Sequence, residues 1–165
     1  MLNIAFVQSK YYVDNLSENI RRGHRAKLRR GVYPGSAPIG YLNNHRTRYI
    51  DIDHERALII RKGFELYATG KYTLKQIARA FKDMELRSHK GKVLAVSCVQ
   101  RILSKSFYYG LFEFKGETYQ GTHEPIVTKK LFDICQEVMK SRGHIKTRKA
   151  EKTFPFRGLL TCGEC

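Results

Sequence analysis

The sequence has few acidic residues. Its 165 residues include 15 Asp and Glu against 31 Lys and Arg, which gives a formal net charge of +16. An excess of this size repels itself in the folded state and concentrates polyanions around the protein. The charge balance therefore favours nucleic acid as the partner, ahead of an anionic membrane surface.

Membrane, secretion and disulfide signals are also missing. No apolar run approaches the length that crosses a bilayer, so we expect no membrane partner. The start "MLNIAFVQ" lacks the basic residues and cleavage site of a signal peptide, so we expect a cytoplasmic protein. Four cysteines in such a chain do not suggest a disulfide framework. Cys98 and Cys135 lie among apolar residues and are expected to be reduced thiols in the core.

Catalytic motifs are missing as well. The chain has no HExxH, no GxSxG and no phosphate-cradling glycine loop. The His-Glu pairs at 54–55 and 123–124 have no second histidine at the required spacing, and no serine has a recognisable base beside it. We therefore expect no catalytic residue here, and no enzyme activity of this chain alone.

Positive charge is concentrated in "ENIRRGHRAKLRRG", residues 18–31. A favourable interaction with the helix dipole needs only one or two cations in the last turn, fewer than this stretch holds. Phosphates on both walls of a DNA groove could surround such a basic rod, and their binding would depend steeply on salt. The expected DNA-binding cations are Arg21, Arg22, Arg25, Lys27, Arg29 and Arg30.

Helix and turn signals predict a mainly α fold with a small β-hairpin, of the α+β class. Residues 3–29 read as one helix with Gly31 as its stop, and the prolines and glycines that follow indicate an extended connector. Thr73 and Gln76 form a capping box, and Ser97 and Thr128 are expected to cap later helices. The remaining predictions are a strand at 48–53, a helix from His54 to Gly70, helices at 74–86 and 97–105, a hairpin turning at Lys115–Gly116, and a helix closed by Gly143.

The helices at 74–86 and 97–105 are arranged like a helix-turn-helix with a long turn. Gln and Arg read base edges by paired hydrogen bonds, so Gln100 and Arg101 are candidate base readers. Ser97 and Lys105 lie on the same polar side, and Lys90 and Lys92 of the connector suit phosphate contacts. A small helical bundle with polar outer faces explains the pattern equally well.

The chain ends in "CGEC", where Cys162 and Cys165 have the spacing of half a tetrahedral zinc site. A redox pair is disfavoured because no strand-helix unit follows. We expect the other two ligands to lie outside this chain, so that zinc belongs to the full-length protein and is not bound by this fragment.

Several stretches together resemble the large serine recombinases, a family of site-specific integrases and transposases. "ENIRRGHRAKLRRGVYPGSAPIGYLNN" is similar to the end of their long helix and the connector after it. "IDIDHERALIIRKGFELYATGKYTLKQIARAF" and "SCVQRILSKSFYYGLFEFKGETYQGTHEPIVTKKLFD" resemble their recombinase domain, and "FRGLLTCGEC" the start of their zinc ribbon. The resemblance implies four parts: a linker helix at 1–30, a connector at 31–48, a recombinase DNA-binding domain at 49–143, and a basic linker with a truncated zinc ribbon at 144–165.

The resemblance also implies a function. Members of this family cut and rejoin two DNA sites with a serine in an N-terminal catalytic domain, which this sequence lacks. The chain would be the DNA-binding fragment of a mobile-element recombinase that recognises an attachment site and acts as a dimer or tetramer when complete. By analogy, the helix end and connector would follow the minor groove and the compact domain would enter the major groove. Two alternatives remain: a stand-alone RNA- or nucleic-acid-binding adaptor, and an interaction module for an acidic partner.

Overall fold

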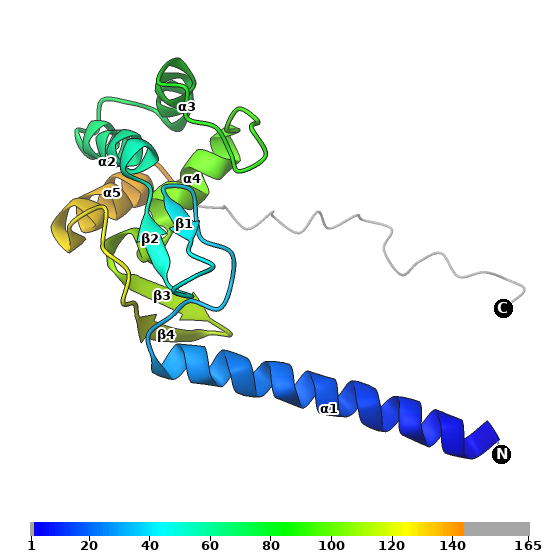
Figure 1. Ribbon diagram of the computed structural model, residues 1–165. Helices are drawn as coiled ribbons and strands as arrows, with labels where there is room; N and C mark the ends of the chain where they lie inside the picture. Colours follow the sequence, from blue (N-terminus) through cyan, green and yellow to red (C-terminus); the bar gives the residue numbers. More distant parts are fainter. Residues whose placement is uncertain (1, 144–165) are drawn as a thin grey trace, which may run out of the picture.

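A long helix leads into a compact, mainly helical body (Figure 1). The computed structural model describes residues 2–143, with side chains from residue 8 onward. The elements in this part are α1 (Leu2–Arg29), β1 (Tyr41–Asn43), β2 (Ile50–Ile52), α2 (His54–Ala68), α3 (Leu74–Asp83), α4 (Val96–Ser104), the 3-10 turn η1 (Ser106–Tyr109), β3 (Leu111–Phe114), β4 (Glu117–Gln120) and α5 (Lys129–Ser141). The predicted α+β class, mainly α, is confirmed.

The first strand pair lies inside the stretch predicted to be an extended connector. β1 and β2 pair antiparallel, with Tyr41 opposite Ile52. Asn44 closes the turn between them, because its side-chain oxygen accepts from the backbone amides of Arg46 at 2.9 Å and Thr47 at 3.1 Å. The sequence predicted the second strand at 48–53 and missed the first, so residues 31–48 are a connector that contains one strand.

The predicted hairpin at Lys115–Gly116 is confirmed. β3 and β4 pair antiparallel, with Leu111 opposite Gln120 and Phe114 opposite Glu117. Lys115 and Gly116 have φ values of +53° and +85°, so both central residues of the turn are left-handed. Turns of this kind match the twist of the flanking strands.

Local capping explains where the helices begin. Thr73 and Gln76 make the predicted capping box, and Thr128 accepts from the Leu131 amide at 3.4 Å as predicted. The prediction that Ser97 caps α4 is wrong. The Ala95 carbonyl already accepts from the amides of Cys98 and Val99, so α4 begins at Val96 and Ala95 stands at the cap without a side-chain bond.

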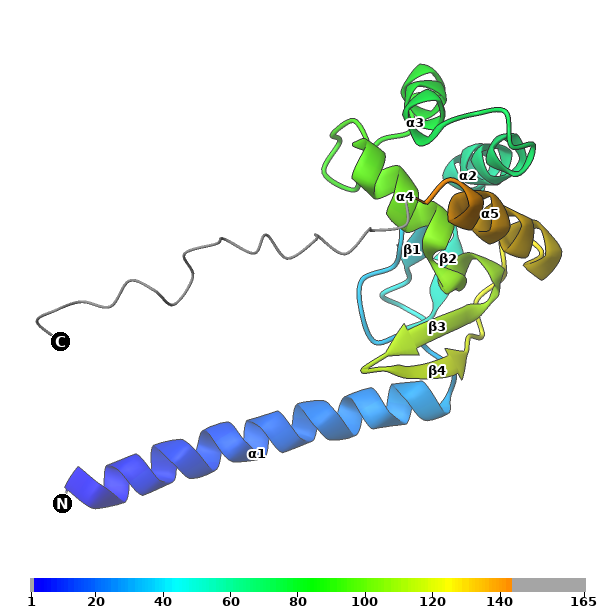
Figure 2. The same ribbon diagram turned by 180° about the vertical axis from the view of Figure 1, so that it is seen from behind.

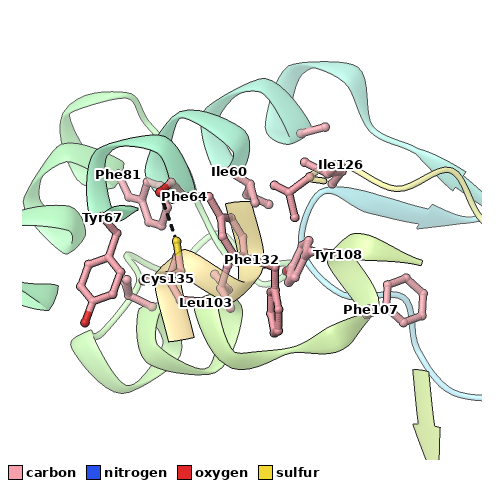
Figure 3. Packing of buried hydrophobic residues seen from close by; sticks show 14 of the residues in the cluster. Ile60, Phe64, Tyr67, Phe81, Leu103, Phe107, Tyr108, Ile126, Phe132 and Cys135 are labelled. Atoms are coloured by element: carbon pink, nitrogen blue, oxygen red, sulfur yellow. Dashed lines mark hydrogen bonds between the residues drawn. The ribbon is translucent and has the colours of Figure 1, made fainter. Parts of the chain in front are cut away.

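The core lies where α2, α4, α5 and η1 meet (Figure 3). Aromatic side chains dominate it, and Cys135 donates its thiol to the Phe64 carbonyl at 3.3 Å. Burial raises the pKa of Cys135 to about 11, which suits the reduced core thiol predicted there. Cys98 is only half-buried, so the same prediction holds in part for it. The labelled core residues are Ile60, Phe64, Tyr67, Phe81, Leu103, Phe107, Tyr108, Ile126, Phe132 and Cys135.

Hydrogen bonds tie the connector to this core. The Tyr108 hydroxyl donates to the Ile39 carbonyl at 2.9 Å, and the Tyr41 hydroxyl donates to the Glu124 carbonyl at 2.8 Å. Both hydroxyls are buried with their rings, and a buried polar group is stable only when it is paired. The connector is therefore anchored along the body at two points.

The end of α1 is joined to the second hairpin, whereas its first half extends away from the body (Figures 1 and 2). Gly31 has φ +68° and ends the helix as predicted, and its carbonyl accepts from the Thr122 amide at 3.0 Å. The His24 ring packs edge-on against Phe114 with 5.7 Å between ring centroids, and Leu28 packs against the core. The last two turns of α1 thus have a fixed position relative to β3 and β4.

Within residues 2–143, no helix combines the length and the apolar character that crossing a membrane requires.

Candidate nucleic-acid interface

All six cations predicted near the end of α1 are exposed. A helix turns by about 100° per residue, so positions can be placed around its axis. His24 and Leu28 mark the side that faces the hairpin. Four arginines then fall within about 100° of arc immediately beside that side, and Lys27 falls on its other side. The arc holds Arg21, Arg22, Arg25 and Arg29.

Carboxylates of the protein neutralise little of this charge. Arg25 is paired with Glu18, and the other ion pairs in the described part of the chain, Arg56–Asp53 and Arg61–Glu65, lie on α2 and at its cap. Five of the six cations therefore make no ion pair there and can bind external anions. An electropositive rod of this kind attracts polyanions by its summed field.

The helix α4 has one buried side and one exposed side. Val99, Ile102 and Leu103 are buried in the core. Ser97, Gln100, Arg101 and Ser104 point to the other side, as the spacing predicted, and all four are exposed.

A groove of about 680 Å³ runs between the end of α4, the connector and β3. Arg101 and Lys105 lie on its α4 wall, and Tyr33 contributes from the connector. The Lys105 ammonium stands 5.6 Å from the Tyr33 ring centroid and 5.9 Å from that of Phe107. Burial and, second, the positive charge of Arg101 lower the pKa of Lys105.

The predicted site residues thus separate into two groups on α4. Arg101 and Lys105 line the groove, and Arg101 donates to the Cys98 thiol at 3.1 Å. Gln100 and Ser97 do not line it and remain on the outer side. The two candidate base readers, Gln100 and Arg101, therefore have different surroundings.

Lys90 and Lys92 lie on an ordered loop beside the connector. Arg87 and Val93 pair across the base of this loop, and Ser88 and Lys92 exchange hydrogen bonds of 2.9 and 3.1 Å. A ring nitrogen of His89, between them, lies 3.1 Å from the Ala37 carbonyl. Both lysines are exposed, and the loop brings them to the same side of the body as the connector.

Sequence reasoning missed Lys115. This exposed residue at the tip of the second hairpin lines the groove beside α4. It also lines a smaller pocket of about 240 Å³ between the hairpin and α1, together with Arg21 and Arg25. The Lys-Gly turn revealed the hairpin, but no periodicity in the sequence links residue 115 to residues 21–25.

The predicted zinc ligands Cys162 and Cys165 lie outside the described residues. Among the residues that are described, no group of three or more His, Cys, Asp or Glu side chains is placed to hold a metal ion. The half zinc site stays a prediction.

These features define the class of the protein: a mainly helical α+β domain, preceded by a basic helix, with exposed cations on the helix and around an adjoining groove. A family model described as Recombinase matches residues 54–142, just over half of the chain. The chain belongs to this Recombinase family, and the resemblance to the large serine recombinases is confirmed.

Individual relatives agree with this placement. "Uncharacterized immunity region protein 5" of Bacillus phage phi105 is 26% identical over 94 residues, which cover 57% of this chain and 71% of that protein. A solved structure described as "Sequence Requirements of the Listeria innocua prophage attP site" is similar with a TM-score of 0.63 and 19% identity over 89% of this chain. Another, "Crystal Structure of a LSR-DNA Complex", is similar with a TM-score of 0.61 and 19% identity over 74% of this chain. The chain spans 62% and 38% of those two chains, and at 19% identity the likeness shows the fold.

Proposed function

We propose that this chain is the DNA-binding part of a site-specific serine recombinase and that it binds the double-stranded DNA of an attachment site. The observation that carries the proposal is a set of exposed cations on α1, on the tip of the second hairpin and along the groove beside α4, most of them without a carboxylate partner in the described residues. Membership of the Recombinase family supports it. The similar structures, whose descriptions name an attP site and an LSR–DNA complex, support it further.

The shape of the body suits two neighbouring grooves of one duplex. The basic end of α1 and the connector would follow the minor groove, where closely spaced phosphates face a narrow segment. The nine residues of α4 span about 13 Å, which is close to the width of the major groove, about 12 Å. Gln100 and Ser97 on its outer side would contact base edges, and Lys90 and Lys92 would contact flanking phosphates.

Assembly of the complete protein would use the first half of α1. Val13, Leu16 and Ile20 recur at spacings of three and four residues, with exposed fractions of 61, 49 and 51%. Exposed apolar residues at this spacing form the seam of a coiled coil. A second copy of the helix would cover this seam in a dimer or tetramer of a longer cytoplasmic enzyme, in which Cys162 and Cys165 complete a zinc site. The chain alone would bind DNA and leave strand exchange to the catalytic domain of that enzyme.

A competition experiment tests DNA binding directly. Fluorescence anisotropy at one salt concentration compares a randomised duplex pool, single-stranded RNA and heparin as ligands. Preference for duplex DNA, with enrichment of one sequence on repeated selection, is the expected result. Tighter binding of RNA would support an adaptor for single strands, although the aromatic residues such a protein displays on a sheet are mostly buried here. Equal binding of heparin would leave only an acidic-partner module.

The outer side of α4 has its own test in the same assay. Replacing Gln100 with Ala removes a donor and an acceptor that pair with adenine, so the selected sequence should change at one or two positions. An equal loss on every duplex would make Gln100 a phosphate contact.

A further inference from the structure

Three cations converge on the groove beside α4 with one carboxylate for company. Arg101 and Lys105 line it from the α4 side, Lys115 lines it from the hairpin, and Glu113 is its acidic residue. None of the three cations takes part in an ion pair of the described residues. Arg101 and Lys105 are four residues apart on one side of the helix, where like charges repel each other.

The helix dipole does not account for this arrangement. Cations in the last turn of a helix interact favourably with its carboxyl end, which explains one or two charges on α4. Lys115 belongs to a different element and lies across the groove, so the dipole of α4 gives no reason for its position. A bound anion would offset the repulsion among all three.

The walls of the groove strengthen its attraction for an anion. Tyr33, Phe107 and Phe112 line it, and the Lys105 ammonium stands over two of these rings. Apolar walls reduce solvent screening, so a charge interaction there is stronger than on an open surface. The same surroundings lower the pKa of Lys105, which means that its ammonium lacks stabilising partners in the unbound protein.

Lys115 also connects the two parts of the proposed interface. It lines the pocket under α1 together with Arg21 and Arg25, as well as the groove beside α4. An anion held here would lie between a strand segment followed by α1 and one followed by α4. A backbone phosphodiester of duplex DNA occupies such a position where the strand passes from one groove to the next.

We propose that Arg101, Lys105 and Lys115 bind one phosphodiester of the DNA backbone in this groove, and that Lys115 thereby fixes the register between the α1 segment and the α4 segment. The proposal rests on the proposed function, and it makes Arg101 a phosphate contact where its residue type alone suggested base reading.

The conformation of Lys115 provides a clean variant. Its φ of +53° is a left-handed value that asparagine adopts readily, so Lys115→Asn removes the charge and keeps the turn. Arg48→Asn is the matched control, because Arg48 is exposed in the turn between β1 and β2, has φ +65° and does not line the groove. Both variants lose one positive charge from the same backbone conformation.

Affinity for duplex DNA is measured for each variant between about 0.05 and 0.3 M salt, with melting curves as a folding check. These concentrations are chosen so that phosphate contacts dominate the slope of log K against log salt, which falls by about 0.9 for each phosphate lost. Lys115→Asn should weaken binding about 3- to 10-fold at 0.15 M, on selected and random duplexes alike, and reduce the slope by about 0.9. Equal effects of Arg48→Asn, or a loss confined to one sequence, would overturn the site.

A double variant tests whether one phosphate is shared. If Arg101 and Lys115 hold the same phosphodiester, Arg101→Gln with Lys115→Asn should reduce the slope no further than the single variant, and the two affinity losses should not multiply. Lys115→Asn combined with Arg22→Ala should give losses that multiply. Multiplying losses in both pairs would mean separate phosphates and would overturn the shared site.

Failure of this site differs from failure of the proposed function. If the unmodified protein shows no preference for duplex DNA, the function itself is wrong. If the unmodified protein binds duplex DNA and Lys115→Asn binds it with the same affinity and slope, only the phosphate site is wrong.

Discussion

At the scale of single residues, Gly63 shows how closely α2 approaches α3. A Cβ at this position would lie 2.3 Å from Cζ of Phe81, and Phe81 is fully buried. Glycine inside a helix is otherwise less stable than alanine by about 1 kcal/mol. Close packing here therefore outweighs helix propensity.

Gly63→Ala should lower the free energy of unfolding by about 1–3 kcal/mol, since the added methyl group displaces the Phe81 ring. Urea denaturation measures this. Gly23→Ala is the control, because Gly23 lies in α1 with nothing within 4 Å of an added methyl group, and it should raise the helix content seen by circular dichroism. Equal stabilisation by both changes would contradict the packing at Gly63.

His123 makes stability depend on pH. Its ring stacks on Phe107 at 3.8 Å, and its Nε2 donates to the Phe107 carbonyl at 2.7 Å in the neutral form. Burial lowers the pKa of His123 below its usual value, and the hydrogen bond opposes this in part. As pH falls through about 6.5, the unfolded chain takes up the proton first, so the native state loses stability on the acid side.

The free energy of unfolding should therefore fall between about pH 7.5 and pH 5, by at most about 1.4 kcal/mol per pH unit from this group. Urea denaturation across that range measures it. His123→Gln keeps a donor for the Phe107 carbonyl and should make the dependence shallower, whereas His45→Asn in the exposed first turn should leave it unchanged. A dependence that survives His123→Gln in full would assign it to another group.

At the scale of elements, the cations of α1 should act through phosphates. Replacing Arg21 and Arg22 with Ala should weaken binding to every duplex sequence and reduce the slope of log K against log salt by about 1.8 for two lost contacts. Replacing Lys129 and Lys130, two exposed residues at the start of α5, removes the same charge from an element outside the proposed interface. The same loss in this control would mean that net charge alone drives binding.

Elements with local causes could be predicted from the sequence, and those with distant causes could not. The capping box at Thr73 and the turn at Lys115–Gly116 depend on neighbours within a few residues, so their patterns were sufficient. The start of α4 was wrong because the Ala95 carbonyl begins the helix without a polar side chain. β1 was missed because a three-residue strand depends on its partner β2 and on the turn at Asn44.

The candidate site shows the same division. Composition and spacing were enough to select the exposed cations of α1 and the polar side of α4. They could not separate Arg101 from Gln100, because the groove wall comes from the connector and from β3. They also could not place Lys115 beside Arg21 and Arg25, since that contact follows from how α1 packs on the hairpin.

At the scale of the whole molecule, Gly31 sets the direction of α1 relative to the body. A Cβ there would lie 2.7 Å from the Gln120 carbonyl oxygen, and φ is +68°. Gly31→Ala should therefore turn α1 away from the hairpin and weaken DNA binding more than about tenfold while the body stays folded. Anisotropy and melting curves measure the two effects.

Gly70→Ala is the control for backbone strain. Gly70 has φ +71° and nothing within 4 Å of an added Cβ, and it follows α2 at a distance from the joint. It should cost similar stability and leave DNA affinity unchanged. Equal losses of affinity in both variants would show that the direction of α1 is not what Gly31 controls.

The attachment of α1 by its last two turns makes the helix a lever. Its 28 residues extend for about 42 Å, and the contacts that hold it, at Gly31, His24 and Leu28, all lie near one end. A rotation of about 10° at that end would carry the other end through about 7 Å, more than one helical turn. Small adjustments where the second hairpin meets the helix would thus be magnified into a change of alignment large enough to bring a distant neighbour into or out of reach.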